Sequence, residues 1–129
     1  MTQEELKKRT KAFALRIIRL VEALPRTTVG RAIGAQVIRA GTSVGANYRA
    51  ACRARSKAEF SAKIGTVVEE ADETAFWLEL LAEARIVPET RLAPLLTEAN
   101  ELTAIFVASR KTASRPPIIN RQSSIGDTL

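Results

Sequence analysis

The chain has 129 residues, 46% of them hydrophobic and 26% charged, which is typical of a single globular domain with one core. One cysteine, Cys52, and the absence of histidine exclude an intramolecular disulfide, a cysteine-based zinc cluster and catalysis by a serine–histidine or cysteine–histidine pair. A net charge of +6 and an isoelectric point near 10.1 are compatible with an anionic partner but do not identify one.

The first predicted helix runs from about Gln3 to Leu24. Thr2 and Glu5 have the spacing of a capping box, in which each side chain accepts the backbone N–H of the other residue. Pro25 ends the helix because proline has no backbone N–H to donate. The apolar residues recur at three-, four- and seven-residue spacings and share one stripe: Leu6, Phe13, Ile17, Leu20 and Leu24.

The second predicted helix runs from about Thr28 to Arg55 and is rich in glycine. Its core stripe consists of Ile33, Val37, Ala40, Val44, Tyr48 and Ala51. Each helical glycine costs about 1 kcal/mol relative to alanine, so these glycines predict the close approach of another helix, within the bundle or from a neighbouring subunit. A phosphate-cradling role is disfavoured because no strand precedes them and their spacing fits no nucleotide-binding motif. The glycines are Gly30, Gly34, Gly41 and Gly45.

Two more helices follow after short connections. The third opens at a second capping box, Ser56 with Glu59, and continues to about Arg85; the fourth opens at Pro88 and ends near Lys111. The inward residues of the third are Phe60, Ile64, Val67, Ala71, Ala75, Leu78 and Ala82. Those of the fourth are Leu92, Leu95, Leu96, Ala99, Leu102, Ile105 and Phe106. We therefore predict an all-α, up-down-up-down antiparallel four-helix bundle over residues 1–111 and a mobile tail over residues 112–129.

Charge is segregated along the chain. Residues 23–58 contain seven basic side chains and no acid, whereas residues 59–83 contain seven acids and one base, Lys63. On the second helix, Arg31, Arg49 and Arg53 project within about 40° of one another, with Arg39 close by. Such a row is either a solvated face or a surface that binds phosphates or carboxylates, to which arginine is suited by its two parallel donors. The nucleic-acid-binding candidates are Arg31, Arg39, Arg49, Arg53, Arg55, Lys8, Lys11 and Arg19.

The outward face of the third helix combines acids with large apolar groups. Phe76 and Leu80 project opposite the core, and Trp77 lies to one side. An apolar centre with a charged rim is typical of a protein interface, and a second copy of the chain is the simplest partner with an arginine-bearing surface. Because the two patches differ, the contact is expected to be heterologous and to form a ring. The interface candidates are Glu69, Glu73, Phe76, Trp77, Leu80 and Glu83.

Residues 34–60 and 68–80 resemble the bacterial four-helix-bundle proteins encoded in intervening sequences of 23S ribosomal RNA genes. The matching features are Gln36 with Arg39, Ser43 four residues before Asn47, the basic run 49–55, the Ser56-Lys57-x-Glu59-Phe60 helix start and the acidic segment 69–79. The resemblance covers about residues 10 to 110. Residues 44–51 read Val-Gly-Ala-Asn-Tyr-Arg-Ala-Ala, where the family often has Ile-Pro-x-Asn-Ile-Ala-Glu-Gly, and this departure favours a divergent subgroup.

The resemblance implies a closed, pentameric ring. It also implies similarity to the accessory subunit of diversity-generating retroelements, a basic pentameric barrel that associates with nucleic acid and a reverse transcriptase. We therefore expect a non-enzymatic, homo-oligomeric bundle that binds RNA or DNA backbones without strong sequence preference. The alternative is a protein–protein adaptor whose arginines serve the contacts of the ring.

Two further expectations concern cofactors and location. The acids at 69, 70, 72 and 73 do not form the di-metal pattern of helical bundles, which requires inward Glu-x-x-His pairs, so no metal and no cofactor is expected. No run approaches the 18 to 20 or so apolar residues of a membrane span, and residues 1–9 lack the apolar core of a secretory signal. The expected location is cytoplasmic, with no membrane partner.

Overall fold

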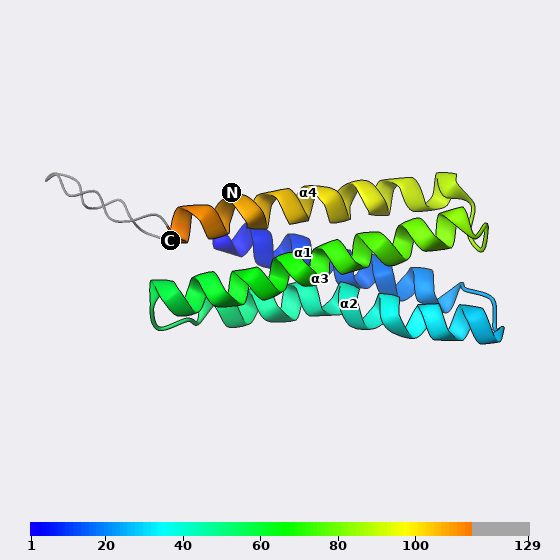
Figure 1. The fold of residues 1–129 in the computed structure, drawn as a ribbon, viewed down its shortest axis with the longest axis horizontal. Helices are drawn as coiled ribbons and strands as arrows, with labels where there is room; N and C mark the ends of the chain where they lie inside the picture. The colour runs from blue at the N-terminus through cyan, green and yellow to red at the C-terminus, as the bar shows by residue number, and fades with distance from the viewer. Residues whose placement is uncertain (115–129) are drawn as a thin grey trace, which may run out of the picture.

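Four α-helices make up the fold in a computed structural model that describes residues 1–114. The helices lie side by side and the chain reverses direction at each of the three turns, so that α1 begins and α4 ends at the same end of the bundle (Figure 1). No strand occurs in the described residues, and the all-α four-helix class is confirmed. The helices are α1 (Gln3–Glu22), α2 (Thr28–Cys52), α3 (Lys57–Glu83) and α4 (Glu89–Ser114).

Side-chain caps begin the first three helices. The Thr2 hydroxyl accepts from the N–H of Glu5 at 3.0 Å, and the Glu5 carboxylate accepts from the N–H of Thr2 at 2.7 Å, which completes the predicted capping box. Ser56 caps α3 as predicted, but the Glu59 carboxylate accepts from the N–H of Arg55 rather than from that of Ser56. The hydroxyl of Thr27 caps α2.

The helix ends differ from the expected ones by a few residues. α1, α2 and α3 all stop before the predicted limits, because the last residues before each turn leave the helical hydrogen-bond pattern. At the other end of the chain, α4 continues to Ser114, so residues 112–114 belong to the helix and not to the predicted tail. The rest of that predicted tail lies outside the described residues.

The core is formed mainly by α1 against α2, α2 against α3 and α3 against α4, whereas α1 and α4 touch at few points. The predicted stripes are buried, although Ile33, Ala82, Leu96 and Ile105 are only half-buried; Leu81, which was not predicted, lies fully inside. Two buried threonines donate to backbone carbonyls one turn back: Thr10 to Leu6 at 2.8 Å and Thr74 to Glu70 at 2.7 Å. Their hydroxyls are therefore satisfied without a ligand.

The glycines of α2 allow α1 to approach closely. A methyl group built on Gly41 would lie 2.7 Å from Cγ1 of Ile17, and one on Gly45 would lie 3.3 Å from the hydroxyl of Thr10. The closest approach of all is at Gly30, where the added carbon would lie 2.1 Å from the carbonyl oxygen of Pro25. Of the two sources of the partner helix that the sequence left open, the one within the bundle accounts for Gly41 and Gly45, whereas Gly30 makes room for the turn that follows α1.

Arg85 is the one non-glycine residue with a positive φ, 58°, in the described chain. It follows α3 in a Schellman arrangement, in which the N–H of Ile86 donates to the carbonyl of Leu81 at 3.0 Å and that of Arg85 to the carbonyl of Ala82 at 3.0 Å. Residues other than glycine pay about 1–2 kcal/mol for this left-handed conformation.

Replacing Arg85 by glycine is therefore expected to raise the free energy of unfolding by about 1 kcal/mol, since glycine adopts this conformation without a steric cost. Urea unfolding followed by circular dichroism measures the change. The matched control is Ala84→Gly at the preceding position, which has an ordinary helical φ of −79° and should be destabilised. If both variants lose stability, the left-handed residue is not strained.

Candidate nucleic-acid interface

A basic groove lies where the first half of α1 runs beside the last turns of α2. Its volume is about 320 Å³, and its lining residues are Glu4, Lys7, Lys8, Lys11, Arg49 and Arg53. The antiparallel turn between α1 and α2 brings these two segments together, although they are about 40 residues apart in sequence. Four of the eight nucleic-acid-binding candidates thus meet in one place. We call this site the α1–α2 groove.

Most of the positive charge in the α1–α2 groove is not neutralised. Lys7 pairs with Glu4 at 3.2 Å, a contact within one turn of α1. Within residues 1–114, none of the other four cations of the groove has a carboxylate at ion-pair distance. No aromatic side chain lines the groove, so it offers charge and hydrogen-bond donors but no stacking platform for bases.

The other four candidates lie elsewhere. Arg31 is at the opposite end of α2, where its guanidinium donates to the carbonyl of Arg26 at 2.9 Å. It shares a helical angle with Arg49, but 18 residues at 1.5 Å separate the two by about 27 Å. Arg55 is exposed in the turn before α3, and Arg19 lies on α1 facing α4.

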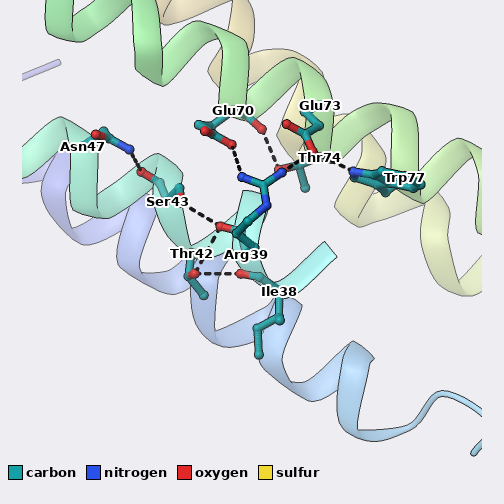
Figure 2. Close-up of polar contacts among 9 residues, drawn as sticks. All are labelled: Ile38, Arg39, Thr42, Ser43, Asn47, Glu70, Glu73, Thr74 and Trp77. Carbon is teal, nitrogen blue, oxygen red and sulfur yellow. Dashed lines mark hydrogen bonds and ion pairs between the residues drawn. The ribbon is translucent and has the colours of Figure 1, made fainter. Parts of the chain in front are cut away.

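Arg39 bridges α2 and α3, although its side chain remains 47% exposed. Its guanidinium donates to the carboxylate of Glu70 at 3.2 Å and to that of Glu73, and the indole N–H of Trp77 donates to Glu73 at 2.9 Å (Figure 2). The donors that would grip a phosphate are therefore engaged by carboxylates of the same chain. The sequence pattern placed Arg39 on a basic surface and Glu73 on an acidic one, whereas the fold joins them.

Small polar side chains near Arg39 also bind within the chain. The hydroxyl of Ser43 donates to the carbonyl of Arg39 at 2.7 Å, and the amide of Asn47 donates to the carbonyl of Ser43 at 2.9 Å (Figure 2). Both bonds reach back one turn of α2, which is the usual way that such residues are satisfied inside a helix. Ser43 and Asn47 therefore have structural roles here.

The predicted aromatic patch stands on the outer face of α3. Phe76 is 52% exposed, and its ring meets that of Trp77 edge to face with centroids 5.0 Å apart. Trp77 and Leu80 are half-buried, and Glu73 is tied to Arg39 as described above. The remaining interface candidates, Glu69 and Glu83, are exposed.

A second ion-pair cluster, which sequence analysis missed, ties α1 to α4. Arg9 binds Glu98 through two parallel hydrogen bonds of 2.7 Å each, and also binds Glu101 at 2.8 Å. The side chains of Arg9 and Glu98 are 26% and 16% exposed. Because hydrogen bonds from Arg9 stabilise the ionised form, the pKa of Glu98 lies below its ordinary value of 4.5.

Glu98→Gln is expected to lower the free energy of unfolding by about 1–2 kcal/mol near pH 7, because it removes a two-bond ion pair that is only partly exposed. The contribution is complete above the ordinary glutamate pKa and disappears as the pH falls through the lower pKa of the folded protein. Urea unfolding at about pH 7 and about pH 3 should thus show the wild type and the variant converging in acid.

Glu101→Gln is the control for that experiment. Glu101 makes one bond to the same arginine and is 58% exposed, so its loss should cost about 0.5 kcal/mol or less. A difference between wild type and Glu98→Gln that is unchanged in acid would contradict the assigned ion pair.

Metal-binding and membrane-spanning features are absent from the part of the chain that the structure describes. In residues 1–114, no group of three or more acidic or cysteine side chains is placed to hold a metal ion. Within the same residues, none of the four helices combines the length and hydrophobicity that a membrane-spanning segment needs.

The comparisons with known proteins agree with the fold. The sequence model of the family described as 23S rRNA-intervening sequence protein matches residues 3–108, which include α1, α2, α3 and most of α4. A crystal structure from Bacteroides thetaiotaomicron, of a protein with unknown function from the S23 ribosomal protein family, is similar with a TM-score of 0.80 and 31% identity. The match covers 86% of this chain and 99% of that one. No curated protein matches the chain. The chain belongs to the 23S rRNA-intervening sequence protein family.

Proposed function

We propose that this protein is a non-enzymatic, homo-oligomeric bundle that binds the phosphate backbone of RNA or DNA in the α1–α2 groove, without strong sequence preference. The observation that carries the proposal is the convergence of Lys8, Lys11, Arg49 and Arg53 on one groove without ion-pair partners in the described chain. A closed ring, pentameric by the family resemblance, would repeat the groove around its axis.

The chemistry of the groove suits phosphates better than bases. Lysine and arginine on adjacent turns can each neutralise one phosphate, and such contacts carry no sequence information. Four contacts correspond to a slope of about −3.6 in a plot of log affinity against log salt for duplex DNA, and about −2.8 for a single strand. The absence of aromatic lining argues against recognition by base stacking.

Fluorescence anisotropy with labelled oligonucleotides tests the proposal. Single-stranded RNA, single-stranded DNA and duplex DNA of mixed sequence would be titrated with the full chain from about 50 to about 200 mM salt. We expect binding that weakens steeply with salt and changes little with sequence. No binding at the lowest salt concentration would overturn the proposal.

The second candidate function is a protein–protein adaptor in which the basic side chains bind carboxylates. Arg39 is the observation that favours it, because this arginine is already occupied by Glu70 and Glu73. Light scattering separates the two functions: in the adaptor, charge reversal in the α1–α2 groove would dissociate the oligomer, whereas in the nucleic-acid-binding protein it would leave the oligomer intact.

A further inference from the structure

A second basic surface lies on the opposite side of α1, along the seam with α4. Arg16 and Arg19 of α1 and Arg91 of α4 line a hollow of about 250 Å³ together with Leu20 and Leu95. None of these three guanidinium groups has a carboxylate at ion-pair distance within residues 1–114. We call this surface the α1–α4 seam.

The α1–α4 seam differs in kind from the α1–α2 groove. The lining of the groove is entirely charged, whereas the seam also includes Leu20 and Leu95, two core residues that keep 9% and 6% of their surface exposed. A phosphate backbone offers no apolar surface on which leucine side chains could pack. A protein surface with an apolar centre and acidic edges fits both parts of the seam.

The outer face of α3 has that composition. Phe76 lies at its centre, more than half exposed, and acids at three- and four-residue spacings flank it along about 21 Å of helix. In the described chain these flanking acids have no ion-pair partner. They are Glu69, Asp72, Glu79 and Glu83. We call this surface the α3 face.

The Arg39 network holds the aromatic centre of the α3 face in place. Arg39 fixes the carboxylate of Glu73, and Glu73 accepts the indole N–H of Trp77 (Figure 2). The ring of Trp77 in turn meets that of Phe76 edge to face. A partner therefore meets aromatic side chains whose orientation is already set, so that little conformational entropy remains to be lost on binding. Rigid aromatic side chains at a patch centre are typical hot spots of protein interfaces.

We propose that the α1–α4 seam of one copy receives the α3 face of the next copy, with Phe76 placed over Leu20 and Leu95 and the acids paired with Arg16, Arg19 and Arg91. The charge complementarity of the two surfaces selects a second copy of this chain as the occupant. The inference rests on the homo-oligomeric part of the proposed function and names the surfaces that form the contact.

The placement of the two surfaces allows successive copies to join. α1 lies behind α3 in the bundle, so the seam and the α3 face point to different sides of one molecule (Figure 1). Each copy can thus use both surfaces at once, which makes the contact heterologous and able to close into a ring. The α1–α2 groove takes no part in this contact and stays open to phosphates.

Charge-reversal pairs test the contact. The seam variant carries Arg19→Glu and Arg91→Glu, and the face variant carries Asp72→Lys and Glu83→Lys; all four positions are exposed. Arg16 is left unchanged because it lies close enough to Glu98 to lower the pKa of that carboxyl. Size-exclusion chromatography with light scattering should give an oligomer for the wild type and a subunit of 14.1 kDa for each variant alone.

Mixing the two variants supplies the decisive result. In the mixture, the acidic seam of the seam variant can bind the lysine-bearing α3 face of the face variant. The unchanged basic seam of the face variant can bind the unchanged acidic α3 face of the seam variant. Association should therefore return when the two variants are mixed. Circular dichroism confirms that each variant is folded. An oligomer that persists in both separate variants, or separate variants that stay single when mixed, would overturn the assigned surfaces. A wild type that is a single subunit at high concentration would instead overturn the homo-oligomer of the proposed function.

Trp77 reports on the same contact, because it is the only tryptophan of the chain. Dilution of the wild type should shift its emission to longer wavelength at the concentration where the oligomer dissociates. Phe76→Ala should weaken association about 30-fold or more, as expected for a hot spot. The matched control is Val29→Ala on α2, a residue that is 53% exposed outside both surfaces and should leave association unchanged. Equal effects of the two truncations would contradict a central role for Phe76.

Discussion

Arg49→Glu combined with Arg53→Glu is expected to reduce oligonucleotide binding at least about 100-fold at about 100 mM salt while the bundle stays folded. The α1–α2 groove holds five cations and Glu4, so its net charge of +4 falls to zero in this variant. Two phosphate contacts are replaced by repulsion, and both side chains are exposed, so little stability is lost. Anisotropy titrations at several salt concentrations measure the change, and the salt slope should fall by about two.

The control is Arg26→Glu combined with Arg31→Glu, which changes the net charge of the chain by the same amount at the far end of the bundle. It should retain affinity within about tenfold, since long-range attraction is screened over about 10 Å at this ionic strength. Equal losses in the two variants would show that overall charge, and not the groove, governs binding. Loss of the oligomer in the Arg49/Arg53 variant, followed by light scattering, would support the adaptor.

Gly41→Val is expected to lower the free energy of unfolding by about 3 kcal/mol. The first carbon of the new side chain would lie 2.7 Å and 2.9 Å from two carbons of Ile17, which is fully buried and β-branched and so has no free rotamer to adopt. The higher helix propensity of valine relative to glycine offsets only a few tenths of a kcal/mol of this loss. Urea unfolding measures the loss in the free energy of unfolding. This loss is a large fraction of the roughly 5–15 kcal/mol by which a typical domain is stable.

Two further variants show whether contact with Ile17 is the cause. Ile17→Ala alone should lower the free energy of unfolding by about 2–5 kcal/mol, because it leaves a cavity. The double variant Ile17→Ala with Gly41→Val should lose at least about 1 kcal/mol less than the sum of the losses of the two single variants. Gly45→Ala is the control, because its added carbon keeps 3.3 Å from Thr10; its stability should stay within about 1 kcal/mol of the wild type. Strict additivity would rule out the proposed clash.

The sequence was sufficient to predict features that depend on neighbours along the chain. Thr2 and Ser56 act through residues three positions on, and the apolar stripes follow from helical periodicity alone. The glycines of α2 could also be interpreted from the sequence alone. Glycine destabilises the interior of a helix, so its repetition on one face predicts that another part of the chain packs closely there. In the structure, residues of α1 lie against Gly41 and Gly45, and the backbone of the turn at Pro25 lies against Gly30.

Features that depend on how two helices are placed against each other could not be predicted. Arg39 was grouped with Arg31 by its helical angle, but the rotation of α3 against α2 decides that it meets Glu70 and Glu73. The bond between Arg9 and Glu98 likewise spans 89 positions. A projection onto a circle discards the rise along the axis, and so it merged Arg31 with Arg49 although they lie at opposite ends of α2.

The position of the α1–α2 groove at one end of the bundle has a consequence for stoichiometry. Cyclic symmetry carries every copy of a surface to the same height along the ring axis, so all the grooves of a ring would encircle one rim. A strand lying on that rim could occupy several grooves in succession, and each further contact would form at a local concentration in the millimolar range. Avidity of this kind would let individually weak grooves retain one long nucleic acid per ring.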